Sequence, residues 1–267
     1  AASMRIAKHY PLHARRIIHG VWGAGQMSWT KNVFVVDDDV DVHDVRAVLR
    51  AAADHCTPDL DIERARGSLD ILDHAAPRLG AGTKLGFDCT RKLASERPDV
   101  PVAPRPHLAA AAREDLLRTV RALPGVRAAT LPDELAGGWL FVSIRKEHPG
   151  DGARVIEEIR RAGGSRLPPY VIVVGGEVDP TNFEQALFHW CAHADASRDA
   201  HIFHVRDADA ASRAVMAIDA TPKLPGDERN GEPVRPWPPL LRMDPDVVER
   251  ISARWREFGL GADLEGE

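Results

Sequence analysis

The feature that most constrains the fold of this chain is an internal repeat, in which the pattern of its first third recurs farther along. A shift of 138 positions aligns Ile6 with Ile144 and continues without a gap to Asp61 and Asp199. Other identical pairs at this shift include Lys8 and Lys146, Pro11 and Pro149, Arg16 and Arg154, Ile18 and Ile156, Val35 and Val173, Val36 and Val174, Val40 and Val178, Asp41 and Asp179, Leu49 and Leu187, and His55 and His193. Two copies of this size predict two related structural units.

The end of the repeat has a different offset. The pattern Asp88-x-Thr90-x-Lys92-Leu93 recurs as Asp219-x-Thr221-x-Lys223-Leu224, at a shift of 131. The second copy has therefore lost seven residues between the two matching blocks.

Each copy alternates strand-like and helix-like segments. The β-branched run from Asn32 to Val36 is bounded by charged residues, which is typical of a buried parallel strand. The spacing of Val45, Val48 and Leu49 then predicts an amphipathic helix, so that strand, turn and helix form a βα unit. We expect an α/β fold of two homologous three-layer units in tandem, with mostly parallel strands and a C-terminal helical tail.

The expected domain boundaries follow the repeat. Residues 1–93 form the first copy, residues 94–122 a linker and helix, and residues 123–267 a diverged second copy with a C-terminal strap and helix. The linker is expected to be extended, because it contains Pro98, Pro101, Pro104 and Pro106. A helix is expected over residues 107–123, and another over residues 243–258.

The two copies begin differently. Pro11 stands where it can begin a helix that runs to Trp22. The second copy has an additional segment, with an acidic turn at Pro132, before the strand from Trp139 to Ile144, whereas only five residues precede Ile6. We therefore expect the first copy to be truncated at its N-terminus.

Composition narrows the class of protein. The formal net charge is -5 and the isoelectric point is about 6.2, which argues against a nucleic-acid-binding protein. No apolar run reaches the ~20 residues of a membrane span, and no signal peptide is recognisable. Cys56, Cys89 and Cys191 are few and far apart, as expected of reduced thiols in a cytoplasmic protein.

The densest acidic cluster runs from Asp37 to Asp44. Several carboxylates could bind a divalent cation, but the second copy has Gly175-Gly176-Glu177 at the positions of Asp37 to Asp39. A metal function shared by both copies is thereby excluded. The favoured interpretation is a strand end whose acids cap the next helix.

Two histidines have helical spacing. His189 and His193 could lie on one helix face and bind zinc. However, the H-E-x-x-H motif is absent, the sequence shows no third ligand, and Ala51 stands opposite His189 in the first copy. The favoured interpretation is a packed helix with incidental histidines.

The segment Gly80-Ala-Gly-Thr-Lys84 could cradle a phosphate, because small residues let backbone N–H groups approach an anion and lysine supplies charge. It does not match a Walker loop or a dinucleotide fingerprint, and a glycine-rich turn is the default interpretation. Val215 replaces Lys84 in the second copy. A ligand contact needed only once and ordinary drift after duplication both explain that loss.

Taken together, the motifs resemble the C-terminal third of UbiD-family decarboxylases. In the first copy these are Lys8-His-Tyr-Pro-Leu-His-Ala14, Trp22-Gly23, Thr30-Lys31-x-x-x-Val-Val-Asp-Asp-Asp-Val-Asp41, Asp59-x-Asp61, Leu72-Asp-His-Ala75 and Gly82-Thr-Lys-Leu-Gly-Phe-Asp88-Cys-Thr-Arg-Lys92. In the second copy they are Ile144-Arg-Lys146-x-x-Pro149, Val173-Val174-x-x-x-Val-Asp179, Asp219-Ala-Thr-Pro-Lys223 and Trp237-Pro238. A core followed by an extra unit is similar to the longer members of the family, including the menaquinone-pathway decarboxylases.

The resemblance implies reversible decarboxylation of an aromatic or α,β-unsaturated carboxylic acid with prenylated FMN, a divalent metal (Mn or Mg) and potassium. In the family, the flavin-binding domain that precedes this region holds the catalytic acids and the metal ligands, so no catalytic or metal-binding residue is assigned here. Lys84 matches the lysine near the phosphate end of the flavin, in a loop from Lys84 to Asp88 that would face the cleft between domains. Cys89 stands where the family usually has alanine, which alters packing.

Three functions remain at this point. The first is the C-terminal part of a UbiD-like decarboxylase, inactive alone, which caps the flavin site of its own N-terminal domain and mediates homo-oligomerisation. The second is a free-standing, non-catalytic subunit or interaction module that partners a separate flavin-bearing chain. The third is an unrelated α/β binding protein. An exposed apolar face on the first copy would favour the first two over the third.

Overall fold

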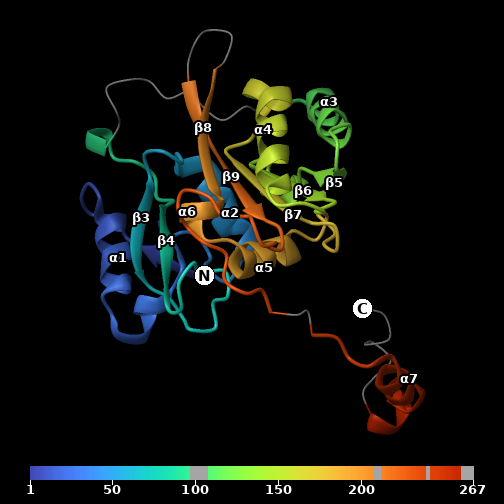
Figure 1. Cartoon of the computed structure of the whole chain (residues 1–267). Coiled ribbons are helices and arrows are strands. Elements are labelled where there is room, and N and C mark those ends of the chain that lie inside the picture. Colours follow the sequence, from blue (N-terminus) through green and yellow to red (C-terminus); the bar gives the residue numbers. More distant parts are fainter. Residues whose placement is uncertain (97–107, 207–211, 239–240, 260–267) are drawn as a thin grey trace. The chain divides into compact units, whose positions relative to one another are not determined.

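A computed structural model describes residues 1–96, 108–206, 212–238 and 241–259 (Figure 1). The chain divides into two compact units, Ala1–Trp237 and Pro238–Glu267. The first unit holds both copies of the repeat, and the second holds the tail. The four prolines of the expected linker lie outside the described residues, and the boundaries at residues 93 and 123 stay a prediction.

Two sheets form the first unit. The first sheet has the strand order β1-β2-β4-β3, and the second has the order β5-β6-β7-β9-β8. In each sheet the central strands are parallel, whereas the edge strands β3, β5 and β8 are antiparallel to their neighbours. The strands are β1 (Ala2–Ile6), β2 (Asn32–Asp37), β3 (Ile62–Ser68), β4 (Ala81–Asp88), β5 (Val126–Thr130), β6 (Trp139–Ile144), β7 (Tyr170–Gly175), β8 (Ala200–Arg206) and β9 (Ser212–Ala220). The expected α/β class with mostly parallel strands is confirmed.

Corresponding elements of the two copies lie at the offsets seen in the sequence. Strand β2, helix α2 (Val45–His55) and strand β3 recur 138 positions later as β7, helix α5 (Phe183–His193) and β8. Strands β4 and β9 correspond at the second offset, and both follow the same path between a parallel and an antiparallel neighbour. Strand β5 has no counterpart among the described strands of the first copy.

The remaining helices of the first unit lie close to their expected positions. They are α1 (His13–Trp22), α3 (Ala110–Arg121), α4 (Asp151–Gly163) and α6 (Ala196–Asp199), with the short 3-10 helices η1 (Gly25–Trp29), η2 (Ala94–Glu96), η3 (Asp133–Leu135) and η4 (Gly164–Arg166). The expectation that Pro11 begins α1 is wrong. Leu12 instead adopts a left-handed conformation with φ 60° at the N-cap, which delays the helix to His13.

The segment from Lys84 to Asp88 is not a loop, and that expectation is wrong. It is the second half of β4, which bonds in parallel to β2 on one side and in antiparallel to β3 on the other. The apolar side chains of Leu85 and Phe87 alternate with Gly86, and both are buried. Because the backbone has a partner on both sides, the segment behaves as a central strand.

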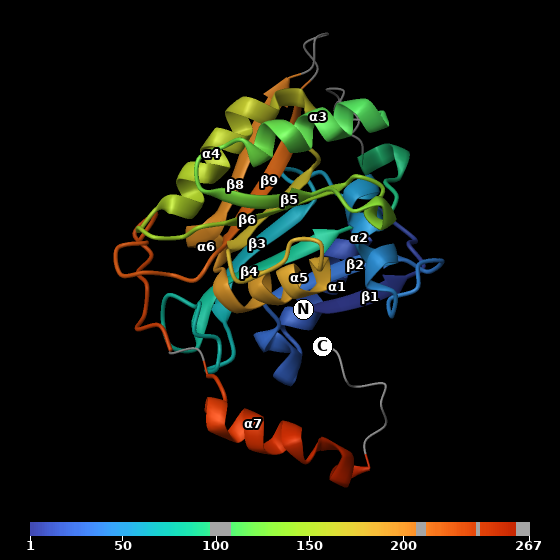
Figure 2. The ribbon, with the colours of Figure 1, turned by 90° about the vertical axis from the view of Figure 1, so that its right-hand side faces the viewer.

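The sheets and helices of the first unit form five layers, which run from α1 on one side to α3 and α4 on the other in Figure 1. Figure 2 looks onto the side that α3 and α4 cover. Helix α1 covers the outer face of the first sheet, where Ile18 packs against Val33 and Val35. Helices α3 and α4 cover the outer face of the second sheet. Helices α2 and α5 lie between the two sheets in a shared core. Each sheet is therefore covered on both faces, and the two three-layer units share their middle helices.

The shared layer is tied to both sheets. Trp139 of β6 donates its indole N–H to the carbonyl of Leu49 in α2, at 2.9 Å. The hydroxyl of Tyr170 in β7 donates to the carbonyl of Cys56, at 3.0 Å. In the opposite direction, the ring of Trp190 in α5 contacts Phe34 in the first sheet, with centroids 6.2 Å apart. Between the two sheets, the copies thus fill one shared core.

The second unit contains the tail helix. Helix α7 (Pro245–Ala253) is followed by the 3-10 helix η5 (Trp255–Phe258). The Asp244 side chain accepts a hydrogen bond from the N–H of Asp246, and Pro245 occupies the first turn. The tail helix expected over residues 243–258 is therefore present, although its last turn is tighter. Within the residues that the structure describes, no helix has the length and apolar character of a membrane span.

Candidate functional site

A buried polar network lies at the carboxyl end of β4. The Asp88 Oδ1 atom accepts hydrogen bonds from the backbone N–H and the hydroxyl of Thr90, at 3.0 and 2.5 Å. The Lys92 ammonium lies 3.1 Å from this oxygen and 3.5 Å from Asp61 Oδ1. It also donates to the Asp88 carbonyl at 2.8 Å. The Asp-x-Thr-x-Lys motif therefore joins the end of β4 to the residue that precedes β3.

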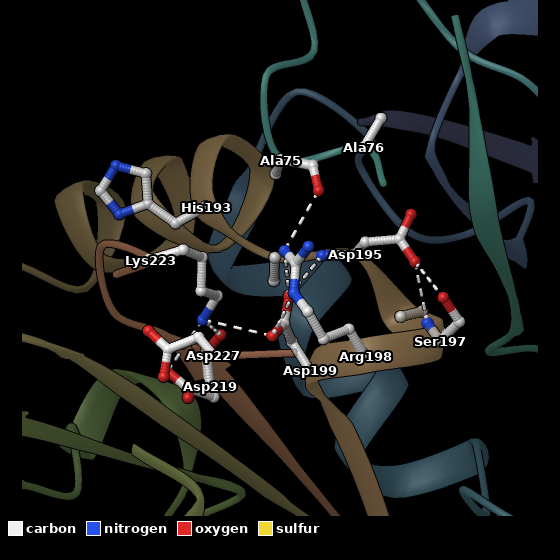
Figure 3. Close-up of polar contacts among 12 residues, drawn as sticks. Ala75, Ala76, His193, Asp195, Ser197, Arg198, Asp199, Asp219, Lys223 and Asp227 are labelled. Carbon is white, nitrogen blue, oxygen red and sulfur yellow. Dashed lines mark hydrogen bonds and ion pairs between the residues drawn. The ribbon is translucent and has the colours of Figure 1, made fainter. Parts of the chain in front are cut away.

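The second copy builds the same network at the end of β9 (Figure 3). Asp219 Oδ1 accepts from the N–H and hydroxyl of Thr221 at 3.0 and 2.5 Å. The Lys223 ammonium lies 3.0 Å from Asp219 Oδ1 and 3.3 Å from Asp199 Oδ1, and it donates to the Asp219 carbonyl at 2.8 Å. Asp199 corresponds to Asp61 at the first offset, so four residues repeat as a constellation.

A further ion pair repeats beside each network. Lys8 lies 2.6 Å from Glu96 in the first copy, and Lys146 lies 2.7 Å from Asp227 in the second. The sequence interpretation missed the acidic partners, although Glu96 and Asp227 stand at the second offset. Aspartate in place of glutamate hid the correspondence from a search for identical residues.

The network of the second copy is more deeply buried. The Lys223 side chain is 0% exposed and that of Lys92 is 18% exposed. Arg198 adds a further ion pair with Asp199 at 2.9 Å. Burial raises the pKa of Asp199. It also opposes ionisation of Asp219, but Lys223 and Lys146 outweigh it and lower the pKa of that carboxyl. Because these charges are paired, the loss of one partner would leave an uncompensated buried charge in either network.

Lys84 differs from these paired lysines. Lys84 lies on β4 and is only 3% exposed. Its ammonium donates a hydrogen bond to the carbonyl of Ser28 in η1. The ammonium also lies 6.0 Å from the centre of the Trp22 ring. Among the described residues no carboxylate pairs with it. Burial lowers the pKa of Lys84, as expected for an ammonium removed from water without a counter-charge.

Sequence features on both sides of Lys84 make room for it. Gly67 of β3 lies beneath the side chain, and a Cβ atom there would come within 3.2 Å of Lys84 Cε and Nζ. On its other side, Met27 and Trp29 flank Ser28 in η1 and are 43% and 45% exposed. The buried ammonium thus lies next to a short segment with two exposed apolar side chains.

The phosphate-cradle hypothesis is wrong for Gly82 and Thr83. Both belong to β4, and the N–H of Thr83 donates to the Asp195 carboxylate at 2.8 Å. Gly82 is required because a Cβ atom there would clash with the same carboxylate. The anion that approaches this backbone is therefore a side chain of the second copy, contributed from 112 residues away.

The acidic cluster of the first copy behaves as a helix entry. Asp44 is the N-cap of α2 and accepts from the N–H of Arg46 at 2.9 Å. Asp37 accepts from the backbone N–H of Arg91 at 2.9 Å, and Asp39 forms an ion pair with the Arg91 side chain. The expected capping role is confirmed at Asp44.

The structure brings His189 and His193 together on α5, with their Nδ1 atoms 3.4 Å apart. It also places Glu177, from the turn after β7, beside them, with Oε1 3.9 Å from His189 Nδ1. Sequence reasoning missed Glu177 because it lies twelve positions before His189 and no motif links the two. The one available signal was its place at the carboxyl end of a parallel strand.

A groove of about 280 Å³ lies beside the start of β4, lined by Arg66, Arg78, Thr83 and Glu232, among others. Glu232 is 3% exposed and forms ion pairs with both arginines. Since one carboxylate already neutralises part of this charge, the groove is a weaker anion site than Lys84. Sequence reasoning missed it because Glu232 lies 166 residues from Arg66.

Comparison with known families gives one match over most of the chain. The sequence model of the 3-octaprenyl-4-hydroxybenzoate carboxy-lyase C-terminal domain matches residues 1–89 and 107–221. An uncharacterized protein of Aeropyrum pernix is 43% identical over 96 residues, and one of Archaeoglobus fulgidus is 42% identical over 96 residues. Each match covers 36% of this chain and 20% of the relative, so the matched part spans about a fifth of these proteins.

The solved structures that match this chain are less similar to it in sequence than these relatives are. Vanillic acid decarboxylase of Sedimentibacter hydroxybenzoicus in its closed form is 16% identical, with a TM-score of 0.44, over 74% of this chain and 44% of that chain. The UbiD-class enzyme HmfF of Pelotomaculum thermopropionicum in complex with FMN is 18% identical, with a TM-score of 0.40, over 70% of this chain and 43% of that chain.

Proposed function

The chain belongs to the family of 3-octaprenyl-4-hydroxybenzoate carboxy-lyase C-terminal domains, and on that premise we propose that it is the C-terminal part of a UbiD-like decarboxylase. The activity proposed for the complete enzyme is decarboxylation of an aromatic or α,β-unsaturated carboxylic acid. This segment supplies the cap over the flavin site, and it is inactive without the flavin-bearing domain. Family membership also removes the third function considered, an unrelated binding protein.

The observation that carries the proposal is that the Lys84 ammonium is buried and contacts no carboxylate among the described residues. A buried ammonium with one carbonyl acceptor retains N–H donors and a full positive charge for an anionic ligand. The phosphate group of FMN fits this requirement, because phosphate oxygens accept charge-assisted hydrogen bonds from lysine. The lowered pKa has the same origin, since burial without a counter-charge disfavours the ammonium until an anion arrives.

Within this chain, each residue near Lys84 has a simple role. Lys84 would hold the phosphate, and Gly67 would keep the path of its side chain free. Trp22 and the η1 segment would exclude water from the ammonium. Prenylated FMN, when bound, supplies the electron-accepting group that decarboxylation needs. The divalent metal (Mn or Mg) and potassium implied by the resemblance are proposed to bind to the flavin-bearing domain.

The exposed apolar residues beside Lys84 would contact the flavin-bearing domain. Met27 and Trp29 flank Ser28 in η1, and the Ser28 carbonyl accepts a hydrogen bond from the Lys84 ammonium. Their burial would supply the hydrophobic part of the contact. The partner is proposed to be an N-terminal domain of the same protein or, in the alternative arrangement, a separate flavin-bearing chain.

The second copy is proposed to be a structural duplicate of the first. Val215 replaces Lys84 and is 0% exposed, so the corresponding site is filled by the core. The second copy would hold the first in place through the shared helices α2 and α5, and the segment would also mediate homo-oligomerisation. The side chains of Ile71, Leu72 and Leu79, which are 69%, 82% and 69% exposed, are candidates for that contact.

The test is flavin retention by the complete decarboxylase. Replacing Lys84 by alanine (K84A) should reduce the flavin retained after gel filtration by about tenfold or more, because a hydrogen bond to a charged group contributes roughly 1.5–3 kcal/mol. The control is Arg161→Ala, since the Arg161 side chain is 72% exposed on α4. Equal flavin content in K84A and in the control would reject the role of Lys84.

A further inference from the structure

We propose that Glu177, His189 and His193 form a binding site for one Zn²⁺ ion in the second copy. The ligand atoms of these three side chains all lie within 4.8 Å of one another. Two histidines and one carboxylate are a ligand set that zinc uses in proteins, with a fourth position left to water. The site would join the turn after β7 to helix α5.

The helix places the two imidazoles. His189 and His193 stand four residues apart on α5, which puts both on one face. Their Nδ1 atoms are 3.4 Å apart. Two ligand atoms that each lie about 2.0–2.1 Å from a tetrahedral zinc ion are separated by roughly 3.3–3.4 Å. The pair therefore has the spacing of shared coordination. His193 Nδ1 also lies 3.2 Å from the carbonyl oxygen of Ala220, a contact that zinc would replace.

The turn after β7 places the carboxylate. Glu177 Oε1 lies 3.9 Å from His189 Nδ1, so a small rotation of a partly exposed side chain brings it to the distance of a third ligand. Its carboxylate folds back over Gly175, where any Cβ atom would clash with both carboxylate oxygens. Glycine at position 175 is thus a condition for this orientation of Glu177.

The surroundings of His193 contain a compensated cation and an aromatic ring. The nearby Lys223 ammonium is held between Asp219 and Asp199, which compensate its charge. The ring of Trp237 lies against His193, with centroids 5.3 Å apart, and shields one side of the site.

The first copy shows what the same scaffold looks like without the site. Ala51 stands at the position of His189, and Asp39 stands at the position of Glu177. Asp39 is occupied by an ion pair with Arg91, whereas Pro222 stands at the position of Arg91 in the second copy. The two copies thus differ at four of these positions, the fourth being Asp37 in place of Gly175. At a fifth position both copies have histidine, as His55 and His193.

The experiment is a calorimetric titration of the complete chain, stripped with EDTA and free of affinity tags, with ZnCl₂. We expect one Zn²⁺ per chain and a rise in Tm on binding. His189→Ala should weaken binding by more than about 100-fold, because even partners outside the ligand shell contribute 10–100-fold. This variant carries the residue that the first copy has there, so the fold should tolerate it.

Two further variants complete the test. Glu177→Gln removes the charge from an exposed side chain and should weaken Zn²⁺ binding while leaving the Tm of the metal-free protein unchanged. His55→Ala, at the corresponding position of the first copy, should bind Zn²⁺ like the unmodified chain. Absence of stoichiometric binding, or equal affinity in His189→Ala and His55→Ala, would overturn the proposal.

Discussion

The first and second copies share one scaffold and differ in what their strand ends offer to a ligand. Both end their central strand in an Asp-x-Thr-x-Lys network of nearly the same distances. Outside that network they diverge. The first copy has Lys84, whose ammonium contacts no carboxylate among the described residues, and the second has Glu177 beside two histidines. The comparison shows that the polar groups of the strand ends were kept while the positions available to ligands changed.

The physical reason for this difference is the cost of an unpaired buried charge. Removing one partner of a buried ion pair leaves the other without compensation, so members of a network can change only together. Lys84 belongs to no such network among the described residues. A single substitution to valine, as at Val215, therefore leaves no charge behind. Isolated charges are free to diverge in a way that networks are not.

The most severe test of the comparison is to transfer the lysine. Val215→Lys places an ammonium in the core beneath α3 and α4, where Val215 is 0% exposed, and should destabilise the protein by roughly 4 kcal/mol or more. The reciprocal change, Lys84→Val, removes a charge that burial already disfavours and should have a smaller effect. Urea denaturation of both variants measures the difference. Equal losses of stability would mean that the two positions are not as different as their environments indicate.

The next test removes the central lysine of each network. Lys223→Met leaves Asp199 and Asp219 facing each other in the core, and it should lower the free energy of unfolding by about 3–5 kcal/mol. Lys92→Met should cost less, about 1–3 kcal/mol, because Lys92 and its partner Asp61 are partly exposed to water. Chemical denaturation of both variants checks the ranking. A greater loss of stability in Lys92→Met would contradict the conclusion that burial makes the network of the second copy more sensitive to the loss of its lysine.

The smallest effect concerns a feature in which the copies agree. Asp44 caps α2 and Asn182 caps α5, and these residues correspond at the offset of 138. Asp44→Ala and Asn182→Ala should each destabilise the protein by about 1 kcal/mol, because each removes one side-chain acceptor from a helix N-terminus. Thermal unfolding would show nearly equal shifts in Tm. A clear difference between them would show that the two helix entries are not equivalent.

The sequence predicted those parts of the fold that depend on local pattern. The run at Asn32, the spacing of Val45 and Val48, and the Asp44 cap all specify elements through neighbouring residues, and the structure confirms them. The strand character of Lys84 to Asp88 was missed because the glycines around it indicate a turn. Pairing with β2 and β3 on both sides overrides that local preference.

The site residues were predictable only where a repeat or a motif pointed to them. Lys84 stood out because its counterpart is Val215. Glu177 and Asp195 did not, since each acts on residues that only the folded chain brings near. Asp195 reaches Thr83 across 112 residues, and no periodicity records such a contact. Long-range polar contacts between the copies are therefore the part of the site that requires coordinates.

The helical layer shared by the two sheets has a consequence for how the chain folds. Because α2 and α5 each pack against both sheets, neither copy can complete its core before the other is present. Contacts between segments more than a hundred residues apart raise the contact order, which slows folding and makes its loss all-or-none. Ala1–Trp237 should therefore unfold in a single cooperative transition. Ligand binding at Lys84 would then stabilise both copies together rather than the first copy alone.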